Sequence, residues 1–100
     1  MSAIRSHLLG DYRAASERLA GYHEELGQLN QAIITLRAAT FQTALSQGLA
    51  VTAAREAADA AVAHHRGDAA ALQGMIDSEL ATLRYLDAYL AYSPEVAAKE

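Results

Sequence analysis

The side chains best suited to chemistry in this sequence are its four histidines, because the chain contains no cysteine. A di-iron bundle needs Glu-x-x-His on facing helices and a zinc protease needs His-Glu-x-x-His, and neither spacing occurs here. His64 and His65 are adjacent, so on a helix they point about 100° apart and cannot hold one ion together. No phosphate-binding loop, nucleophile elbow or paired catalytic carboxylate is recognisable either. We therefore expect no metal, no cofactor, no catalytic residue and no enzymatic activity.

Three tyrosines near the end of the chain are the stronger candidate for a function. Tyr85, Tyr89 and Tyr92 are spaced i, i+4 and i+7, so a helix would carry them on one face, beside Asp87. Tyrosine is favoured at protein interfaces because it adds a large rigid area and one hydroxyl. In the alternative interpretation, the rings lie beside the contact between the protein's own two helices. A third interpretation is that the rings stack on nucleic-acid bases, which the acidic surroundings oppose. The candidate protein interface is Tyr85, Tyr89, Tyr92, Phe41 and Leu45.

The balance of charge opposes a dedicated nucleic-acid binder. The net charge is −4 and the pI about 5.5, whereas phosphate neutralisation needs a surplus of Lys and Arg on one surface. The arginines are spread out with acids near by. An alternative function nevertheless stays open, namely a nucleic-acid-associated accessory protein in replication or recombination that uses Arg5, Arg13 and Arg18 from paired chains.

The strongest structural signal is a repeat of apolar or small residues in steps of four and three, which is typical of a coiled-coil seam. Its members are Leu8, Tyr12, Ala15, Leu19, Tyr22, Leu26, Leu29, Ile33 and Leu36. Beyond Ile33 the pattern broadens to include Ile34, Ala38, Phe41 and Leu45, which favours contact with more than one neighbour. Polar residues near the seam are candidates for setting its register, or else a solvated face. They are Gln28, Asn30 and Gln31.

A turn and a second helix follow. Gly48 suits the left-handed residue that ends a helix, with Leu49 as its hydrophobic partner. Thr52 suits the N-cap of a helix that begins at Ala53. Gly67 and Asp68, within the sequence Arg66-Gly67-Asp68, predict a kink or short break. Pro94 marks the end of this helix.

The short connection predicts that the two helices run antiparallel as neighbours. In that register large side chains meet small ones, with Phe41 and Leu36 near Ala58. A single pair of helices leaves part of the apolar side of each helix exposed to water. Either the break lets the tail fold back into a three-helix bundle, or two chains pair into a four-helix bundle; we favour the second.

One hundred residues are enough for a single modest core, so we expect one all-α domain over 1–100, a long antiparallel, coiled-coil-like helical hairpin. The expected ranges are helix one at about 3–47, the turn at 48–51, helix two at about 53–92 with a break at 65–68, and a frayed tail at 94–100. No stretch is long and apolar enough to span a membrane or serve as a signal peptide, so we expect a cytoplasmic protein. Its expected partners are itself and an unidentified protein.

The layout of a long first helix, a glycine-containing turn near residue 48 and a second helix that opens with 51–57, Val-Thr-Ala-Ala-Arg-Glu-Ala, resembles small helical proteins of actinobacterial phages. Those proteins mostly lack an assigned function. The resemblance covers most of the chain and implies a phage-encoded protein that binds a host or virion protein. Length and layout are also similar to the WXG100 proteins, but the turn has no Trp, and residues 92–95 read Tyr-Ser-Pro-Glu where that family carries its secretion signal.

Overall fold

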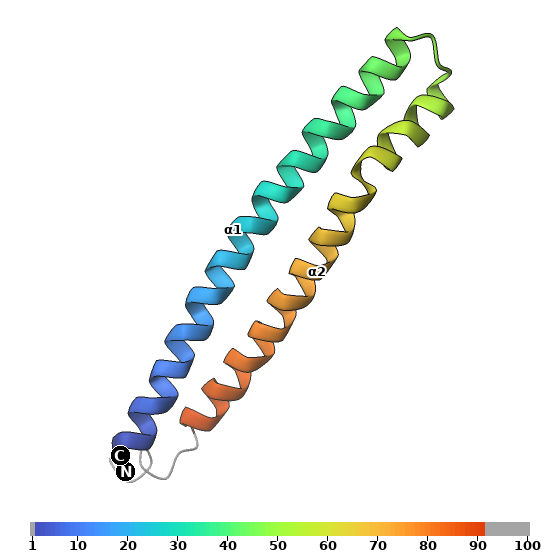
Figure 1. Ribbon diagram of the computed structural model, residues 1–100. Helices are drawn as coiled ribbons and strands as arrows, with labels where there is room; N and C mark the ends of the chain where they lie inside the picture. Colours follow the sequence, from blue (N-terminus) through green and yellow to red (C-terminus); the bar gives the residue numbers. More distant parts are fainter. Residues whose placement is uncertain (1, 92–100) are drawn as a thin grey trace. The chain divides into compact units, whose positions relative to one another are not determined.

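The structure, a computed structural model, describes residues 2–91 and consists there of two helices. They are α1 (Ser2–Ser46) and α2 (Val51–Ala91), joined by a short turn (Figure 1). No strand occurs among the described residues. The predicted all-α helical hairpin is therefore confirmed. The expected tail at 94–100 lies outside the described residues.

The turn ends α1 with a left-handed glycine, as the sequence predicted. Gly48 has a φ of +89°, in the left-handed region. The amide of Leu49 donates to the carbonyl of Ala44 at 3.1 Å, and the amide of Gly48 donates to the carbonyl of Leu45 at 3.0 Å. These two hydrogen bonds form a Schellman motif, in which Gly48 is the first residue beyond the helix cap. The motif satisfies two carbonyls at the helix end and reverses the chain.

We expect alanine to have opposite effects at two glycines of this chain. Gly48→Ala forces a side chain into the left-handed region and should cost about 1–2 kcal/mol of unfolding free energy. Gly67→Ala should add about 1 kcal/mol, because Gly67 is an exposed helical residue. A Cβ at either position meets no atom within 4 Å, so neither effect is a steric clash with neighbouring residues. Thermal melts of both variants test this, and a shift of the same sign in both contradicts it.

The second helix begins two residues earlier than expected. The amide of Ala54 donates to the carbonyl of Ala50 at 2.8 Å, so the helical bonding starts at Ala50. Thr52 is consequently a residue of the first turn rather than the N-cap. Helix ends are set by a balance of weak local bonds, and an offset of one or two residues is common.

The break expected at 65–68 is absent, because α2 is helical throughout Val51–Ala91. Gly67 keeps a helical backbone, since Gly48 is the one glycine with a positive φ. His64 Nε2 lies 3.5 Å from Asp68 Oδ2, one turn further along the same helix. A glycine inside a helix costs about 1 kcal/mol, which is too little to end a helix whose flanking turns are packed. Within the described residues the chain therefore has no third helix to fold back.

The chain divides into two compact units, and both helices continue through the boundary between them. In unit 1, residues 2–23 of α1 pack against residues 74–91 of α2. Its buried side chains are Ala15, Ile76 and Leu86. The half-buried residues around them continue the predicted seam, among them Leu8, Tyr12, Leu19, Leu80, Leu83 and Leu90. The single domain expected over 1–100 stays a prediction.

Unit 2 comprises residues 24–73 with the turn, and its buried side chains are smaller. They are Ala44, Ala54, Ala58 and Val62. The inward positions of α2 here are spaced four, four and three, from Ala54 to His65, and those of α1 from Leu29 to Thr40 follow the same steps. Eleven residues in three turns is a spacing of 3.67, close to the 3.6 of an undistorted helix.

That change of spacing overturns one expectation about the seam. Leu36 is 36% exposed, and the neighbouring Arg37 is half-buried, although its side chain, which is bonded to Asp59, is itself 43% exposed. The step from Ile33 to the next half-buried residue of α1 is therefore four rather than three. Phe41 is half-buried and Ala58 fully buried, so Ala58 lies inside as expected. The contact between the two residues stays a prediction.

A search of the described residues finds no helix apolar enough to cross a membrane.

Candidate functional site

The tyrosines singled out from the sequence lie at the surface of unit 1. Tyr85 is 67% and Tyr89 49% exposed. Their ring centroids are 6.3 Å apart with planes tilted by 34°, a separation within the usual range for aromatic pairs. Tyr92 lies outside the described residues. Two large rings, stacked loosely on each other and largely uncovered, form the most conspicuous surface feature of this unit.

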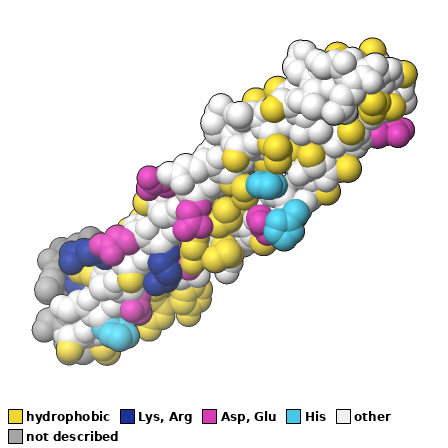
Figure 2. Space-filling view, turned by 45° about the horizontal axis from the view of Figure 1, so that its top comes forward, with side chains coloured by type: hydrophobic (Ala, Val, Ile, Leu, Met, Phe, Trp, Pro, Cys, Tyr) yellow, Lys and Arg dark blue, Asp and Glu magenta, His cyan; other side chains and the backbone are white. Residues whose placement is uncertain are grey.

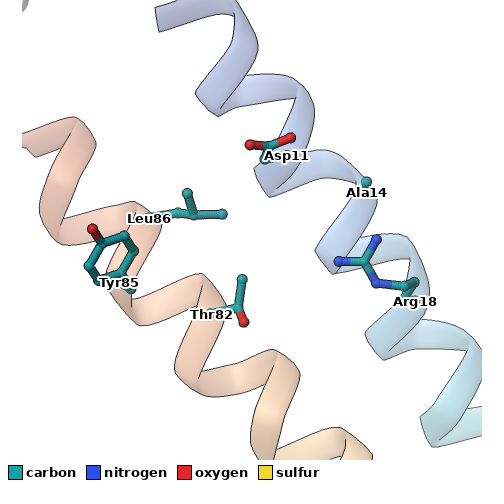
Figure 3. Close-up of a pocket in the computed structure, with 6 residues that line it drawn as sticks. All are labelled: Asp11, Ala14, Arg18, Thr82, Tyr85 and Leu86. Carbon is teal, nitrogen blue, oxygen red and sulfur yellow. The ribbon is translucent and has the colours of Figure 1, made fainter. Parts of the chain in front are cut away.

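A groove lies beside these rings, between α1 and α2 of unit 1. Its volume is about 330 Å³. Figure 3 shows Leu86 pointing from α2 towards α1, and Arg18 pointing from α1 towards α2. The groove is lined by Asp11, Ala14 and Arg18 of α1 and by Thr82, Tyr85 and Leu86 of α2. It combines an apolar wall with one acidic and one basic group.

Arg18 is held at the groove by an ion pair across the two helices. Its Nε donates to Glu79 Oε1 at 2.9 Å, and its Nη2 donates to Glu79 Oε2 at 3.2 Å. The hydrogen bond to Glu79 raises the pKa of Arg18, and Asp11 contributes in the same direction through its charge. A two-bonded arginine and carboxylate fix the direction of the guanidinium more firmly than a single contact does. Arg18 is thereby a positioned cation rather than a free surface side chain.

Five of the exposed residues of α2 in unit 1 are spaced in steps of three and four, so they lie along one side of the helix beside the buried seam. They are Met75, Ser78, Thr82, Tyr85 and Tyr89. We name the surface formed by these five residues, with Asp11, Ala14 and Arg18 of α1, the Tyr85 face. Met75, Tyr85 and Tyr89 are three of the five large apolar side chains that are exposed in the described part of unit 1; Ile4 and Leu9 are the others. Large apolar side chains on a second side of a helix are typical of a helix that packs on two sides.

The other two interface candidates, Phe41 and Leu45, belong to unit 2 and are half-buried. Ile34, on the same helix, is 61% exposed. The four candidate residues that the structure describes are therefore divided between the two units, with Tyr85 and Tyr89 in unit 1. Gln28, Asn30 and Gln31 are all exposed and lie outside the seam between the helices. Their part in setting register stays a prediction.

Unit 2 carries its own charge cluster on Asp59. Arg37 Nε donates to Asp59 Oδ1 at 2.9 Å, and Arg66 Nη2 reaches the same oxygen at 3.4 Å. The hydrogen bond from Arg37 lowers the pKa of Asp59, and Arg66 adds to that effect. A lowered pKa means that the pair stabilises the fold above the ordinary Asp pKa and is lost as the pH falls through the lowered one. Because these groups are exposed to solvent, the contribution is small.

The arrangement of these arginines bears on the nucleic-acid alternative. Arg18, Arg37 and Arg66 each donate to a carboxylate, so the charge of each is already partly neutralised. Arg5 is half-buried and Arg13 exposed. Binding through Arg5, Arg13 and Arg18 stays a prediction, which requires a shift of DNA mobility at about 50 mM salt that weakens steeply as salt is added.

The histidines do not converge. His7 lies 3.5 Å from Asp11, and His64 lies 3.5 Å from Asp68, each contact joining successive turns of one helix. The rings of His64 and His65 meet edge to face, with centroids 6.3 Å apart. Within residues 2–91 no three His, Asp or Glu side chains are grouped so that they could hold a metal ion. His65 differs from the others because its Nδ1 is buried in unit 2 without a hydrogen-bond partner.

We expect His65→Leu to stabilise the protein. His65 occupies an inward position between Val62 and Ala69, and its buried Nδ1 makes no hydrogen bond. An unsatisfied buried polar atom costs about 1–3 kcal/mol, which leucine would remove while adding apolar contact. His64→Leu is the matched control, because His64 is exposed and should change stability by no more than about 0.5 kcal/mol. Urea titrations measure both, and a lower stability of His65→Leu would show that the ring nitrogen is satisfied.

The fold and surface define an all-α, two-helix protein with an aromatic face in one unit. Comparison with known proteins found no matching family model, no matching curated protein and no matching solved structure. The functional argument therefore rests on the residues themselves. Sequence reasoning found Tyr85 and Tyr89 but missed the groove beside them. Two features of the sequence could have indicated this groove. They are the seven-residue spacing of Asp11 and Arg18, and the residues spaced three and four apart from Met75 to Tyr89.

Proposed function

We propose that this chain is a non-enzymatic protein–protein interaction module that acts as a homo-oligomer. The observation that carries this proposal is that the buried apolar side chains are mostly small, whereas many large apolar side chains are exposed. Among residues 2–91, four of the seven buried apolar residues are alanines, whereas nine large apolar side chains are at least 36% exposed. Hydrophobic side chains reach the surface on the face drawn in Figure 2, among acidic and basic groups. Such a surface gains free energy when a protein covers it.

Pairing of two hairpins into a four-helix bundle is the simplest closed assembly that would cover these exposed apolar side chains.

Light scattering coupled to gel filtration tests self-association at low micromolar concentration. The expected mass is about twice the 10.6 kDa of one chain. A compact species of 10.6 kDa over the whole concentration range would refute the homo-oligomer.

The resemblance to small actinobacterial phage proteins extends the proposal to a second partner, a host or virion protein. Phe41 and Leu45, with the exposed Ile34 near them, are the surface of unit 2 on which such a partner would bind. Affinity capture from host lysate with the wild-type chain and with Ile34→Asp tests this. A specific partner should be captured by the first and lost by the second, and Ala60→Asp, a charge added at an exposed residue of the other helix, should retain it. Equal capture by all three baits would exclude this surface.

A further inference from the structure

The Tyr85 face carries a pattern of charge that matches a second copy of itself. Asp11 and Arg18 are seven residues apart, so they lie two turns apart on one side of α1, with Ala14 between them. Under a two-fold axis beside Ala14, Asp11 of each copy meets Arg18 of the other. One acid and one base then give two ion pairs, as an interface between identical surfaces requires.

The groove gives the Tyr85 face a shape that a second copy can fit, in addition to the matching charges. Arg18 and Glu79 are level with each other, so Tyr85, six residues beyond Glu79, is level with Tyr12 on antiparallel α1. Asp11 and Tyr85 accordingly lie on opposite walls of the same groove. A guanidinium that enters there finds a carboxylate on one side and an aromatic ring on the other, two groups that both attract it.

Arg18 is suited to this contact by its existing bonds. The Nε and Nη2 of Arg18 donate to Glu79, so its Nη1 can donate to a second carboxylate. The bridge also limits the motion of the side chain, which reduces the conformational entropy lost on binding. At the centre of the arrangement, Ala14 is small enough for two helices to approach closely.

We propose that a second copy of this chain covers the Tyr85 face about a two-fold axis beside Ala14, with Arg18 of each copy between Asp11 and Tyr85 of the other. This inference rests on the self-association proposed above and assigns it a surface. Met75 and Tyr89, exposed along the same face, supply the apolar area, and the reciprocal ion pairs select the antiparallel orientation.

A charge exchange tests the arrangement without a structure of the dimer. Asp11→Arg sets arginine against Arg18 at both contacts, and Arg18→Asp sets aspartate against Asp11. Each variant alone should dimerise about tenfold or more weakly than the wild type, because like charges then face each other. A one-to-one mixture of the two variants has an opposite pair at both contacts. The mixture should recover a dimer that neither variant forms alone, measured by sedimentation equilibrium.

Three further variants separate this result from a loss of folding. Glu79→Gln loosens Arg18 but removes no charge that the proposal places between copies, so its dimer should weaken much less than tenfold. Arg84→Asp reverses an exposed charge outside the Tyr85 face and should also leave the dimer unchanged. Tyr85→Ala should weaken the dimer about tenfold or more with no loss of helix by circular dichroism, since the ring is exposed in the single chain.

The outcomes distinguish the inference from the function it rests on. A monomeric wild-type chain refutes self-association and this surface together. If the wild type dimerises and the Asp11, Arg18 and Tyr85 variants dimerise equally well, self-association stands and the Tyr85 face is not the contact. If both charge variants are monomeric and their mixture is too, the two-fold pairing of Asp11 with Arg18 is wrong.

Discussion

Ile76→Ala should cost about 2–5 kcal/mol of unfolding free energy, the largest loss that we expect from one substitution in this chain. Ile76 is 1% exposed and has the largest fully buried side chain among residues 2–91. Its truncation removes apolar contact and leaves a cavity that two long helices cannot easily close. Since a domain of this size is stable by about 5–15 kcal/mol, the loss is a large part of the total.

The same residue type at the surface provides the control. Ile34 is 61% exposed, so Ile34→Ala should change the stability of the single chain by no more than about 0.5 kcal/mol. Chemical denaturation at a concentration where the chain is monomeric measures both variants. A loss at Ile34 as large as that at Ile76 would mean that the inside and outside of α1 are assigned wrongly.

Ala58→Leu should destabilise the protein by about 1–3 kcal/mol through overpacking. Ala58 is fully buried between the helices of unit 2, where the buried neighbours Ala44 and Ala54 are small as well. A leucine at this place has no space unless the two backbones separate.

Ala60→Leu is the matched variant, because Ala60 lies two residues further along the same helix and is exposed. Its melting temperature should stay close to that of the wild type, whereas that of Ala58→Leu should fall by roughly 5–20 °C for a domain of this size. Equal melting temperatures would show that the antiparallel register is wrong.

Much of the fold follows from short-range features of the sequence. Gly48 predicts the end of α1, because a left-handed residue followed by Leu49 completes a Schellman motif that few other residues allow. The alternation of apolar residues predicts which side of each helix is buried, and Ala58 and Ala60 fall inside and outside as expected. These features depend on neighbours within about one turn of helix, so the sequence alone is sufficient for them.

The errors arose where contacts across the two helices outweighed local preference. Gly67 stays helical although glycine disfavours it, since the turns on either side are packed. Arg37 rather than Leu36 is the half-buried residue, in a stretch where its bond to Asp59 joins the two helices and an eleven-residue spacing replaces the heptad. Neither effect can be read from one helix by itself.

The candidate surface likewise has features that the sequence predicts by itself and features that only the tertiary structure determines. The exposed rings of Tyr85 and Tyr89 follow from a helical period that is visible in the sequence, and that period determined their common side. The groove, and the bridge that directs Arg18 into it, bring together residues 61 positions apart in the chain. Only the tertiary structure decided them, because the register between two helices depends on the packing of both at once, whereas a periodic pattern describes each helix alone.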